Sequence, residues 1–456
     1  MSAVELATET CDRLERLGPR YNAVASLTRT RALREAATAD RALARGGSAS
    51  TLTGIPYGAK DLLAARGAPT TWGAAPYRKQ VLRYDATAVT KLRRAGAVLA
   101  AKLAMVELAG GGGYRYPSAS LQGPGRNPWD TGRWSGGSSS GSGAAVGAGL
   151  VPFALGSETS GSIGTPAAYC GVTGIRPTYG LVSRHGAMAL SWTLDKIGPL
   201  ARTADDCATV LEAIAGPDAK DATVSGKRFR RLAPGTAREA VAAVRVGYAG
   251  EEIEVVASAE ARGALARGVE ELERIAPRFV EARLPDLPYG PMVSTVYIAE
   301  GATIFADLIE SDRFDEMPDE RQKAGLRAAL DIRARDYLQA MRLRTVLAQR
   351  MRDLFKECDV ILSCTRTVTA TPIDQALDAA PAPPATPGAP PRGNVGLIPA
   401  GNLAGLPAIF FPCGLGTDGL PVGLQLVGPP FSEPLLVAIV EAYQRETGHH
   451  ALRPSI

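Results

Sequence analysis

The sequence predicts a single large α/β domain in which a mixed, twisted β-sheet is covered by helices. Short apolar runs of strand length alternate with longer stretches of helical periodicity, the pattern of a sheet packed against helices. Hydrophobic residues make up 45% of the 456 residues and charged residues 21%, the usual balance of a globular protein. No internal repeat and no clear linker divides the chain, so we expect one domain despite its length.

In the first quarter of the chain, helical and strand patterns alternate. The apolar residues Val4, Ala7, Cys11 and Leu14 share one helical face, and Gly18-Pro19 follows as a stop signal. Gly54 to Leu63 has the composition of a short buried strand that carries a lysine into apolar surroundings. We therefore predict helices at 4–17, 30–45, 86–95 and 102–109 and strands within 54–63 and at 97–101.

After residue 178 the predicted elements are fewer and more widely spaced. Thr203 is an N-cap residue, and the two aspartates that follow it suit the first turn of a helix. Residues 379–393 are rich in proline, which cannot join helices or sheet ladders, so we expect an exposed loop or flap there. We further predict turns at 179–199, a polar surface excursion at 216–243, helices at 203–215, 257–275, 320–355 and 433–445, and strands at 244–248, 360–363, 408–412 and 422–427.

Charge, leader and cysteine content argue against several classes of protein. The chain has 51 Lys and Arg against 46 Asp and Glu, a net charge of +5, without a run of five basic residues, so we expect no nucleic-acid partner. The charged, helical N-terminus is unlike a secretory signal, and no apolar run reaches the roughly 18 residues of a membrane span. We expect a cytoplasmic protein without a metal site, because the cysteines have neither C-x-x-C nor zinc-ligand spacing. The six are Cys11, Cys170, Cys207, Cys358, Cys364 and Cys413.

The stretch from Ser135 to Thr178 holds the strongest functional signal. Two clusters of glycine and serine, 136–143 and 156–164, flank the short apolar run 150–155. An ordinary Gly/Ser linker is polar throughout, whereas these apolar pieces need burial and would pin the turns to a core. Glycine lets backbone N–H groups converge on one point, and serine adds hydroxyls there. Such a turn suits an anion or a developing oxyanion.

Three residues are candidates for catalysis: Lys60, Ser138 and Ser162. A serine hydroxyl needs a base at neutral pH, and histidine is the common one. His449 and His450 lie at the end of the chain, and His185 follows an arginine in a turn where we expect it to be exposed. Lysine can replace histidine, because burial disfavours its charged form.

These residues lie in motifs that resemble the amidase signature family. The matching segments are Gly54 to Asp61, Gly136 to Gly141 and Gly161 to Thr178, with Ser138 and Ser162 separated by 24 positions. Further similarity covers Asp195 to Leu200, Asn402 to Ala408 and Gly419 to Gly428. The resemblance implies an amidase domain over 1–456, with its core in 54–215 and 395–446 and a variable region at about 216–355.

The resemblance also implies a role for each motif residue. Ser162 matches the acylated nucleophile, Ser138 the serine that relays the proton, and Lys60 the base, neutral before attack. The backbone N–H groups of Thr159, Ser160, Gly161 and Ser162 match the oxyanion hole, and neither a metal nor a cofactor is required. The sequence departs from the usual Asp-x-Gly-Gly-Ser-Ile-Arg at three positions, with Glu158, Ser160 and Gly164. These changes affect the geometry of the loop and the shape of the substrate site more than the nucleophile, and Gly164 removes a cation that could pair with the acid.

The resemblance implies a small amide, ester or carbamate substrate. Some environmental members of the family are urethanases, and a broad aromatic pocket would suit an aryl or alkyl carbamate. We see no concentrated cationic pocket in the sequence, which argues mildly against an obligate carboxylate substrate. We expect a monomer or homodimer. The predicted substrate contacts are Gly112, Gly113, Tyr114, Trp192, Ile398 and Asn402.

Other readings of the sequence remain open. A component of a tRNA-dependent transamidating enzyme shares these motifs, but it would need partner chains. Gly141 to Gly147 loosely resembles a dinucleotide-binding loop, although its third glycine comes one place late and no clear strand precedes it. A non-catalytic binding module would keep its function after Ser162→Ala.

Overall fold

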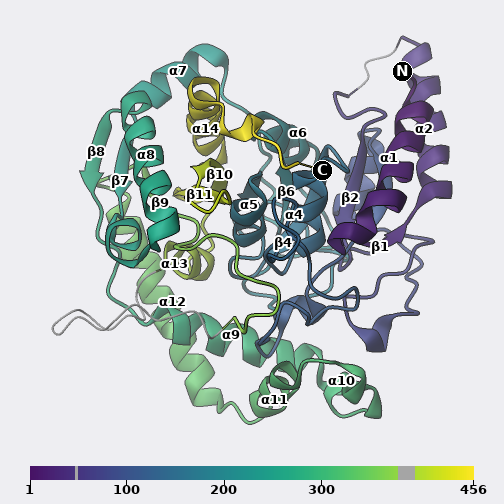
Figure 1. Cartoon of the computed structure of the whole chain (residues 1–456). Coiled ribbons are helices and arrows are strands. Elements are labelled where there is room, and N and C mark those ends of the chain that lie inside the picture. Colours follow the sequence, from purple (N-terminus) through teal and green to yellow (C-terminus); the bar gives the residue numbers. More distant parts are fainter. Residues whose placement is uncertain (47–49, 378–395, 456) are drawn as a thin grey trace.

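All eleven strands that the computed structural model describes belong to one mixed sheet. Residues 1–46, 50–377 and 396–455 are described. The strand order is β1-β3-β2-β4-β6-β5-β10-β11-β9-β7-β8, and helices cover the sheet (Figure 1). This confirms the predicted fold class, a single large α/β domain with a mixed sheet.

The first half of the chain builds one end of the sheet. Parallel pairing joins β2 to both β3 and β4, whereas β6 runs antiparallel to β4 and β5. Every residue of these five strands is buried, and only the edge strand β1 is half-buried along its length. The bounds are β1 Val24–Leu27, β2 Pro56–Lys60, β3 Val98–Leu103, β4 Phe153–Glu158, β5 Thr173–Arg176 and β6 Lys196–Ala201.

The second half of the chain completes the sheet. β10 pairs antiparallel with both β5 and β11, so a strand from near the C-terminus lies beside one from the Gly/Ser-rich region. The far edge, β8, is largely exposed. The bounds are β7 Arg245–Tyr248, β8 Arg278–Glu281, β9 Val360–Cys364, β10 Ala408–Leu415 and β11 Pro421–Val427.

The helices of the first half pack on this sheet with the faces that the sequence predicts. Helix α1 buries Ala7, Cys11 and Leu14, and the Thr203 hydroxyl caps helix α6 by accepting from the Asp206 N–H at 3.0 Å. Figure 1 shows α1 and α2 at one end of the sheet. The bounds are α1 Ala3–Leu17, α2 Arg29–Ala44, α3 Thr87–Arg94, α4 Ser140–Gly147, α5 Gly164–Cys170, α6 Ala204–Ile214 and α7 Pro234–Ala243.

The second half contributes helices of two kinds. Helices α8 and α14 pack on strand β10, whereas α9 to α12 gather at the base of the molecule in Figure 1. The bounds are α8 Ala259–Ile275, α9 Tyr289–Ile304, α10 Ala306–Ile309, α11 Glu320–Ala329, α12 Ala334–Leu354, α13 Leu397–Leu403 and α14 Glu433–Thr447.

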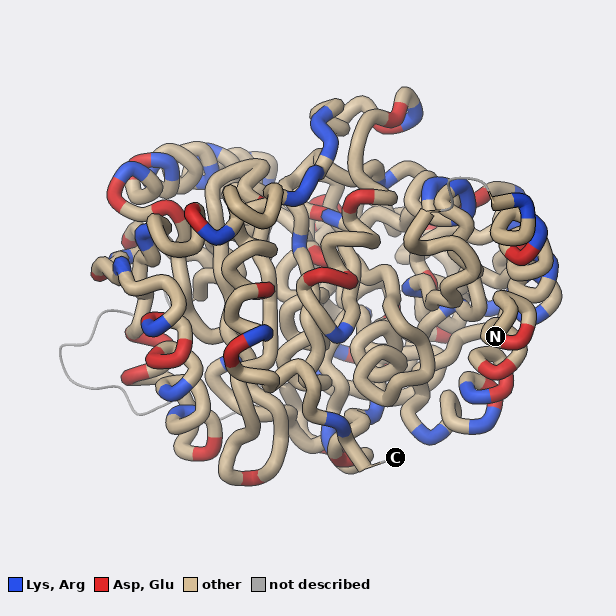
Figure 2. The backbone as a smooth tube through the Cα atoms, turned by 90° about the horizontal axis from the view of Figure 1, so that it is seen from above, with Lys and Arg blue, Asp and Glu red and all other residues tan. Residues whose placement is uncertain are grey.

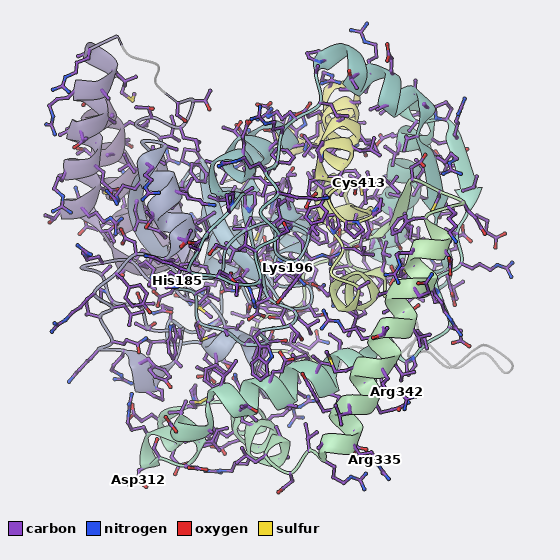
Figure 3. All side chains as sticks on the ribbon, turned by 180° about the vertical axis from the view of Figure 1, so that it is seen from behind. His185, Lys196, Asp312, Arg335, Arg342 and Cys413 are labelled. Atoms are coloured by element: carbon purple, nitrogen blue, oxygen red, sulfur yellow. The ribbon has the colours of Figure 1, made fainter. Side chains whose placement is uncertain are left out.

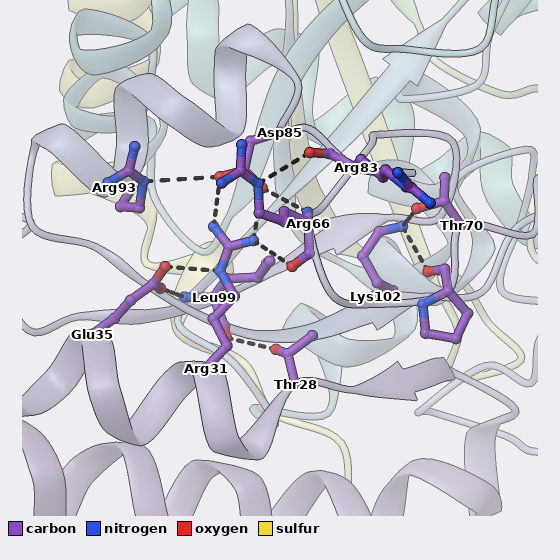
Figure 4. A network of polar contacts seen from close by, with 11 residues as sticks. Thr28, Arg31, Glu35, Arg66, Thr70, Arg83, Asp85, Arg93, Leu99 and Lys102 are labelled. Carbon is purple, nitrogen blue, oxygen red and sulfur yellow. Dashed lines mark hydrogen bonds and ion pairs between the residues drawn. The ribbon is translucent and has the colours of Figure 1, made fainter. Parts of the chain in front are cut away.

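A polar network ties α2 to the sheet (Figure 4). Arg31 donates to Asp85 through both terminal nitrogens, at 2.8 and 3.1 Å, and to Glu35 at 2.8 Å. The second carboxylate oxygen of Glu35 accepts from the backbone N–H of Leu99 in β3, at 2.9 Å. Because these groups are largely buried and mutually paired, they fix the helix in register against the strand.

Four of the sequence predictions need correction. Residues 102–109 are not a helix, because β3 runs on to Leu103 and only a short 3₁₀ turn, Glu107–Gly110, follows. The Ala- and Leu-rich composition there reflects burial on both faces of a parallel strand. Strand β6 begins inside the predicted turn region 179–199, the predicted excursion 216–243 contains α7, and 320–355 is two helices, α11 and α12. The proline-rich stretch 379–393 lies outside the described residues.

The surface has no single dominant sign of charge along the described backbone. Figure 2 shows acidic and basic residues interspersed on both flanks of the molecule. Among the helices of the described chain, none combines the length and the apolar character needed to cross a bilayer. All six cysteines are buried and free.

Candidate active site

Lys60 ends strand β2 inside the molecule, where its amine meets three hydroxyls. Its Nζ lies 2.7 Å from Ser138 Oγ and 3.0 Å from both Ser139 Oγ and Ser157 Oγ. The side chain is fully buried, and this burial lowers the pKa of Lys60 to about 7, against the smaller opposing effect of the Asp195 and Glu158 carboxylates. An amine of this kind is substantially neutral at physiological pH and can accept a proton.

Ser138 stands at the start of the segment that leads into helix α4. The Gly137–Ser138 peptide bond is cis, and the carbonyl of Ser138 accepts from the Val106 N–H at 3.1 Å. The next residue, Ser139, donates its backbone N–H to the carbonyl of Ser162 at 3.3 Å. The two serine-containing turns are therefore held side by side over the lysine.

Ser162 lies between strand β4 and helix α5 and lines a cavity of about 480 Å³. The preceding Gly161 has φ +84°, a conformation that disfavours any residue with a Cβ. Ser160, at a position where the family often has glycine, does not have a positive φ. Thr159 and Ser160 line the same cavity, so the four predicted oxyanion residues form one turn against it.

Glu158 supports this turn from below. Its Oε2 accepts from the backbone N–H groups of Ile163 and Gly164, at 2.9 and 3.0 Å. Its Oε1 accepts from Arg176 at 2.9 Å and from Asn402 at 2.8 Å. Although burial by itself raises the pKa of Glu158, the nearby Arg176 guanidinium and the other donors bring it down to about 2. The carboxylate is therefore ionised and holds the start of α5.

Arg176 supplies the cation that the sequence motif lacks at position 164. It is fully buried at the end of β5 and also donates to the carbonyl of Leu406 at 3.0 Å. A Cβ at Gly164 would lie 2.7 Å from the ring of Phe410, so no side chain fits there. The acid thus has a partner, contributed by the neighbouring strand instead of by the serine loop.

Two further buried groups extend the support. Thr159 donates its hydroxyl to Asp195 at 2.6 Å, and Asp195 also accepts from the N–H groups of Leu190 and Ser191. Lys196 donates to the side-chain oxygen of Asn402 at 2.6 Å. Burial lowers the pKa of Lys196 well below its usual value. Figure 3 places Lys196 near the middle of the molecule.

The predicted substrate contacts fall in different places. Gly113 and Tyr114 line the cavity of Ser162. Gly112 packs against helix α11, where an added Cβ would lie 2.6 Å from the Gln322 carbonyl. Trp192 lines a neighbouring cavity of about 230 Å³ that shares the wall residues Ala109, Thr159 and Leu190 with the first. Ile398 and Asn402 are buried in α13, where Asn402 holds Glu158.

Histidine is absent from the walls of the Ser162 cavity among the described residues. His185 lines the neighbouring cavity instead, together with Asp195 and Lys196, and is half-buried. His449 pairs with Glu271 at 2.9 Å on α8. The arrangement at Ser162 is consequently that of two serines and a lysine.

The cavity contains charge that the sequence motifs do not predict. Two arginines line it, Arg321 from the first turn of α11 and Arg366 from the loop after β9, together with the aromatic rings of Tyr114, Trp134, Tyr169 and Tyr297. The expectation of no concentrated cationic pocket does not hold for this cavity. The two arginines are brought to it from outside the Gly/Ser-rich motifs, which contain no signal for them.

Sequence comparison assigns the chain to a family with this arrangement of motifs. The family model described as Amidase matches residues 5–437. The chain belongs to the amidase signature family. Curated relatives of this amidase-family chain include the A chain of the glutamyl-tRNA(Gln) amidotransferase of Azoarcus sp. (strain BH72), 36% identical over 100% of this chain and 96% of the relative. The corresponding amidotransferase chain from Chloroflexus aggregans is also 36% identical, over 100% of this chain and 95% of its own length.

Solved structures resemble this amidase-family chain over nearly its whole length. One, described as "An unexpected vestigial protein complex reveals the evolutionary origins of an s-triazine catabolic enzyme", has a TM-score of 0.86 and 31% identity, covering 98% of this chain and 96% of that one. The native peptide amidase from Stenotrophomonas maltophilia has a TM-score of 0.83 and 30% identity, covering 98% and 94%. These similarities show the family and its fold, and the relatives differ in the reactions their names describe.

Proposed function

We propose that the chain is a stand-alone serine hydrolase of the amidase type, which cleaves the amide, carbamate or ester bond of a small aryl or alkyl substrate. The observation that carries the proposal is the contact of 2.7 Å between the buried Lys60 amine and Ser138. A lysine held in this way, beside a turn that presents a second serine to a cavity, has the parts needed for nucleophilic catalysis.

The proposed reaction passes through an acyl-enzyme. Neutral Lys60 takes the proton of Ser138, Ser138 takes that of Ser162, and the Ser162 oxygen attacks the substrate carbonyl. The N–H groups of residues 159–162 stabilise the oxyanion, a contribution of about 3–4 kcal/mol for each such donor in comparable enzymes. The proton returns along the same path to the leaving nitrogen or oxygen, and water then hydrolyses the acyl-enzyme to the free acid.

Intact-mass analysis after treatment with a fluorophosphonate or sulfonyl fluoride probe tests this proposal. We expect one adduct, on Ser162, which is lost in both Ser162→Ala and Lys60→Ala while the fold is kept. Lys356→Ala is the matched control, because this lysine is exposed on the surface and pairs with Asp353. Labelling of a different serine, or labelling that survives Lys60→Ala, would contradict the proposed mechanism.

The relatives favour a second candidate, one component of an amidotransferase. The names of the curated relatives describe that activity, at 36% identity over the whole chain. Turnover of a nitroanilide or an aryl carbamate by the purified chain alone supports the stand-alone hydrolase. Activity that appears only with added partner chains, with glutamine as the nitrogen donor, supports the transferase.

The remote dinucleotide-binding alternative finds no support in the fold. Gly141 and Gly143 lie within helix α4, where a Cβ on either would meet the Ala23 carbonyl at 2.4 Å or the side chain of Pro166 at 2.7 Å. These glycines allow close packing of helix against neighbouring chain, whereas a dinucleotide loop needs them in the turn between a strand and a helix.

A further inference from the structure

The cavity that holds Ser162 has a one-sided charge. Among its described wall residues, Arg321 and Arg366 carry charge and there is no aspartate or glutamate. Both arginines are exposed although they line a cavity, so their side chains have solvent-accessible surface. Charged groups of one sign in a partly enclosed site raise the local concentration of ligands of the opposite sign.

The two arginines come from elements that are far apart in the sequence. Arg321 lies in the first turn of α11, and Arg366 lies in the loop that follows β9. The guanidinium of Arg366 stands over the ring of Tyr169, 6.0 Å from its centroid, and the ring itself forms part of the wall. Stacking on an aromatic ring leaves the in-plane N–H groups of an arginine available to an anion.

We propose that the substrate carries a carboxylate, or a comparable anion, at a position other than the scissile bond, and that Arg321 and Arg366 bind it. The inference rests on the proposed hydrolase function and specifies its substrate class. Guanidinium groups match the geometry of a carboxylate and can donate two parallel hydrogen bonds to it. The aromatic walls formed by Tyr114, Trp134 and Tyr297 would surround the uncharged remainder of the substrate.

Two matched pairs of chromogenic substrates test the inference. The 4-nitroanilide of succinic acid, with a free carboxylate on the acyl side, is compared with its neutral succinamide isostere. The N-acetyl derivative of 5-amino-2-nitrobenzoate, charged on the leaving group, is compared with 4-nitroacetanilide. We expect kcat/KM for the anionic member of at least one pair to exceed that of its neutral partner about tenfold or more, and the preference to shrink as salt is added.

Variants then assign the preference to the arginines. Arg366→Met and Arg321→Met should each lower kcat/KM for the preferred anionic substrate about tenfold more than for its neutral partner, and Arg366→Lys should recover part of the preference. Arg335→Met is the control, because Arg335 is 77% exposed on α12, away from the cavity (Figure 3). The control variant should keep the full preference.

The possible outcomes separate this inference from the proposed function. Equal rates for both members of each pair, or a preference for the neutral ones, would overturn the inference while turnover and the Ser162 adduct still supported the hydrolase. A preference for the anion that persists in both methionine variants would also overturn it. Loss of turnover of every substrate together with the absence of a Ser162 adduct would instead contradict the hydrolase itself.

Discussion

At the scale of single residues, the site depends on one lysine that is surrounded by hydroxyls. Lys60 has three serine oxygens within 3.0 Å and is fully buried. Hydroxyls solvate an amine without giving it the full counter-charge of a carboxylate in contact. The ammonium form therefore loses more on burial than it recovers, and the neutral form becomes accessible.

This environment predicts the pH dependence of activity. The pKa of Lys60 is lowered to about 7, so below pH 7 the amine is protonated and cannot accept the proton of Ser138. On the acid side, kcat/KM should rise about tenfold per pH unit and level off above an apparent pKa of about 7. The measurement is a pH profile with a neutral ester or anilide that does not itself ionise across the range studied. A flat profile on both sides of neutrality would show that no group of this pKa acts as the base.

The buried pair of Arg176 and Glu158 predicts a large loss of stability on truncation. Arg176→Met leaves the carboxylate of Glu158 buried with its cation gone, which should lower the free energy of unfolding by about 3–5 kcal/mol. Because Glu158 holds the N–H groups of Ile163 and Gly164, kcat/KM should fall as well.

Urea denaturation and kinetics of the same preparation measure both effects. Arg333→Met is a suitable control, since its pair with Asp336 is exposed and should contribute less than about 1 kcal/mol. Similar losses in the two variants would mean that the buried pair has no special role.

At the scale of elements, the glycines decide how closely helices approach the site. Helix α11 packs against the glycine-rich turn 110–113, and the carbonyl of Gly112 would lie only 1.9 Å from a Cβ at Gly325. The turn itself forms part of the cavity through Gly110 and Gly113. The position of α11, and with it that of Arg321, is thus coupled to the shape of the wall.

Gly325→Ala tests this coupling. Alanine normally stabilises a helix interior relative to glycine by about 1 kcal/mol, but here the new methyl group must displace the Gly112 backbone. We expect a lower melting temperature and a lower kcat/KM.

The matched control is Gly263→Ala in α8. That position is exposed, and its nearest contact to an added Cβ is the end of the Arg267 side chain at 3.6 Å. The control should be neutral or stabilised in thermal unfolding, and stabilisation of Gly325→Ala to the same degree would refute the coupling.

At the scale of the whole molecule, one continuous sheet brings the two halves of the chain to the same site. Lys60 and both serines come from the first half, whereas Asn402 and Arg366 come from the second. The antiparallel pairing of β5 with β10 joins the halves next to the Glu158 network. The cysteines are spread over both halves and all are buried within this structure.

Thiol titration reports on the integrity of this core. Each of the six cysteines is at most 2% exposed, and burial raises the pKa of thiols such as Cys358, to about 11. A thiolate reagent should therefore modify none of them within minutes in the native protein and all six after denaturation. Rapid native reaction of one or more cysteines would show that part of the core opens easily.

Much of this architecture follows from local patterns in the chain. The α/β class, the helix beginning after Thr203, and the strands at 244–248 and 360–363 are all expected from periodicity and capping, because such signals depend on neighbouring residues. The helix predicted at 102–109 is wrong, since an alanine-rich strand buried on both faces lacks the alternation that identifies most strands.

The chemistry of the chain divides in the same way. Composition and motif spacing alone point to Lys60, Ser138 and Ser162, because the Gly/Ser turns and the apolar context of the lysine are written in consecutive residues. The pairing of Glu158 with Arg176 and Asn402, and the meeting of Arg321 with Arg366 at one cavity, became visible only in three dimensions. Residues separated by up to 244 positions make these contacts. Their partners are chosen by how the sheet and helices pack, which no local pattern of residues records.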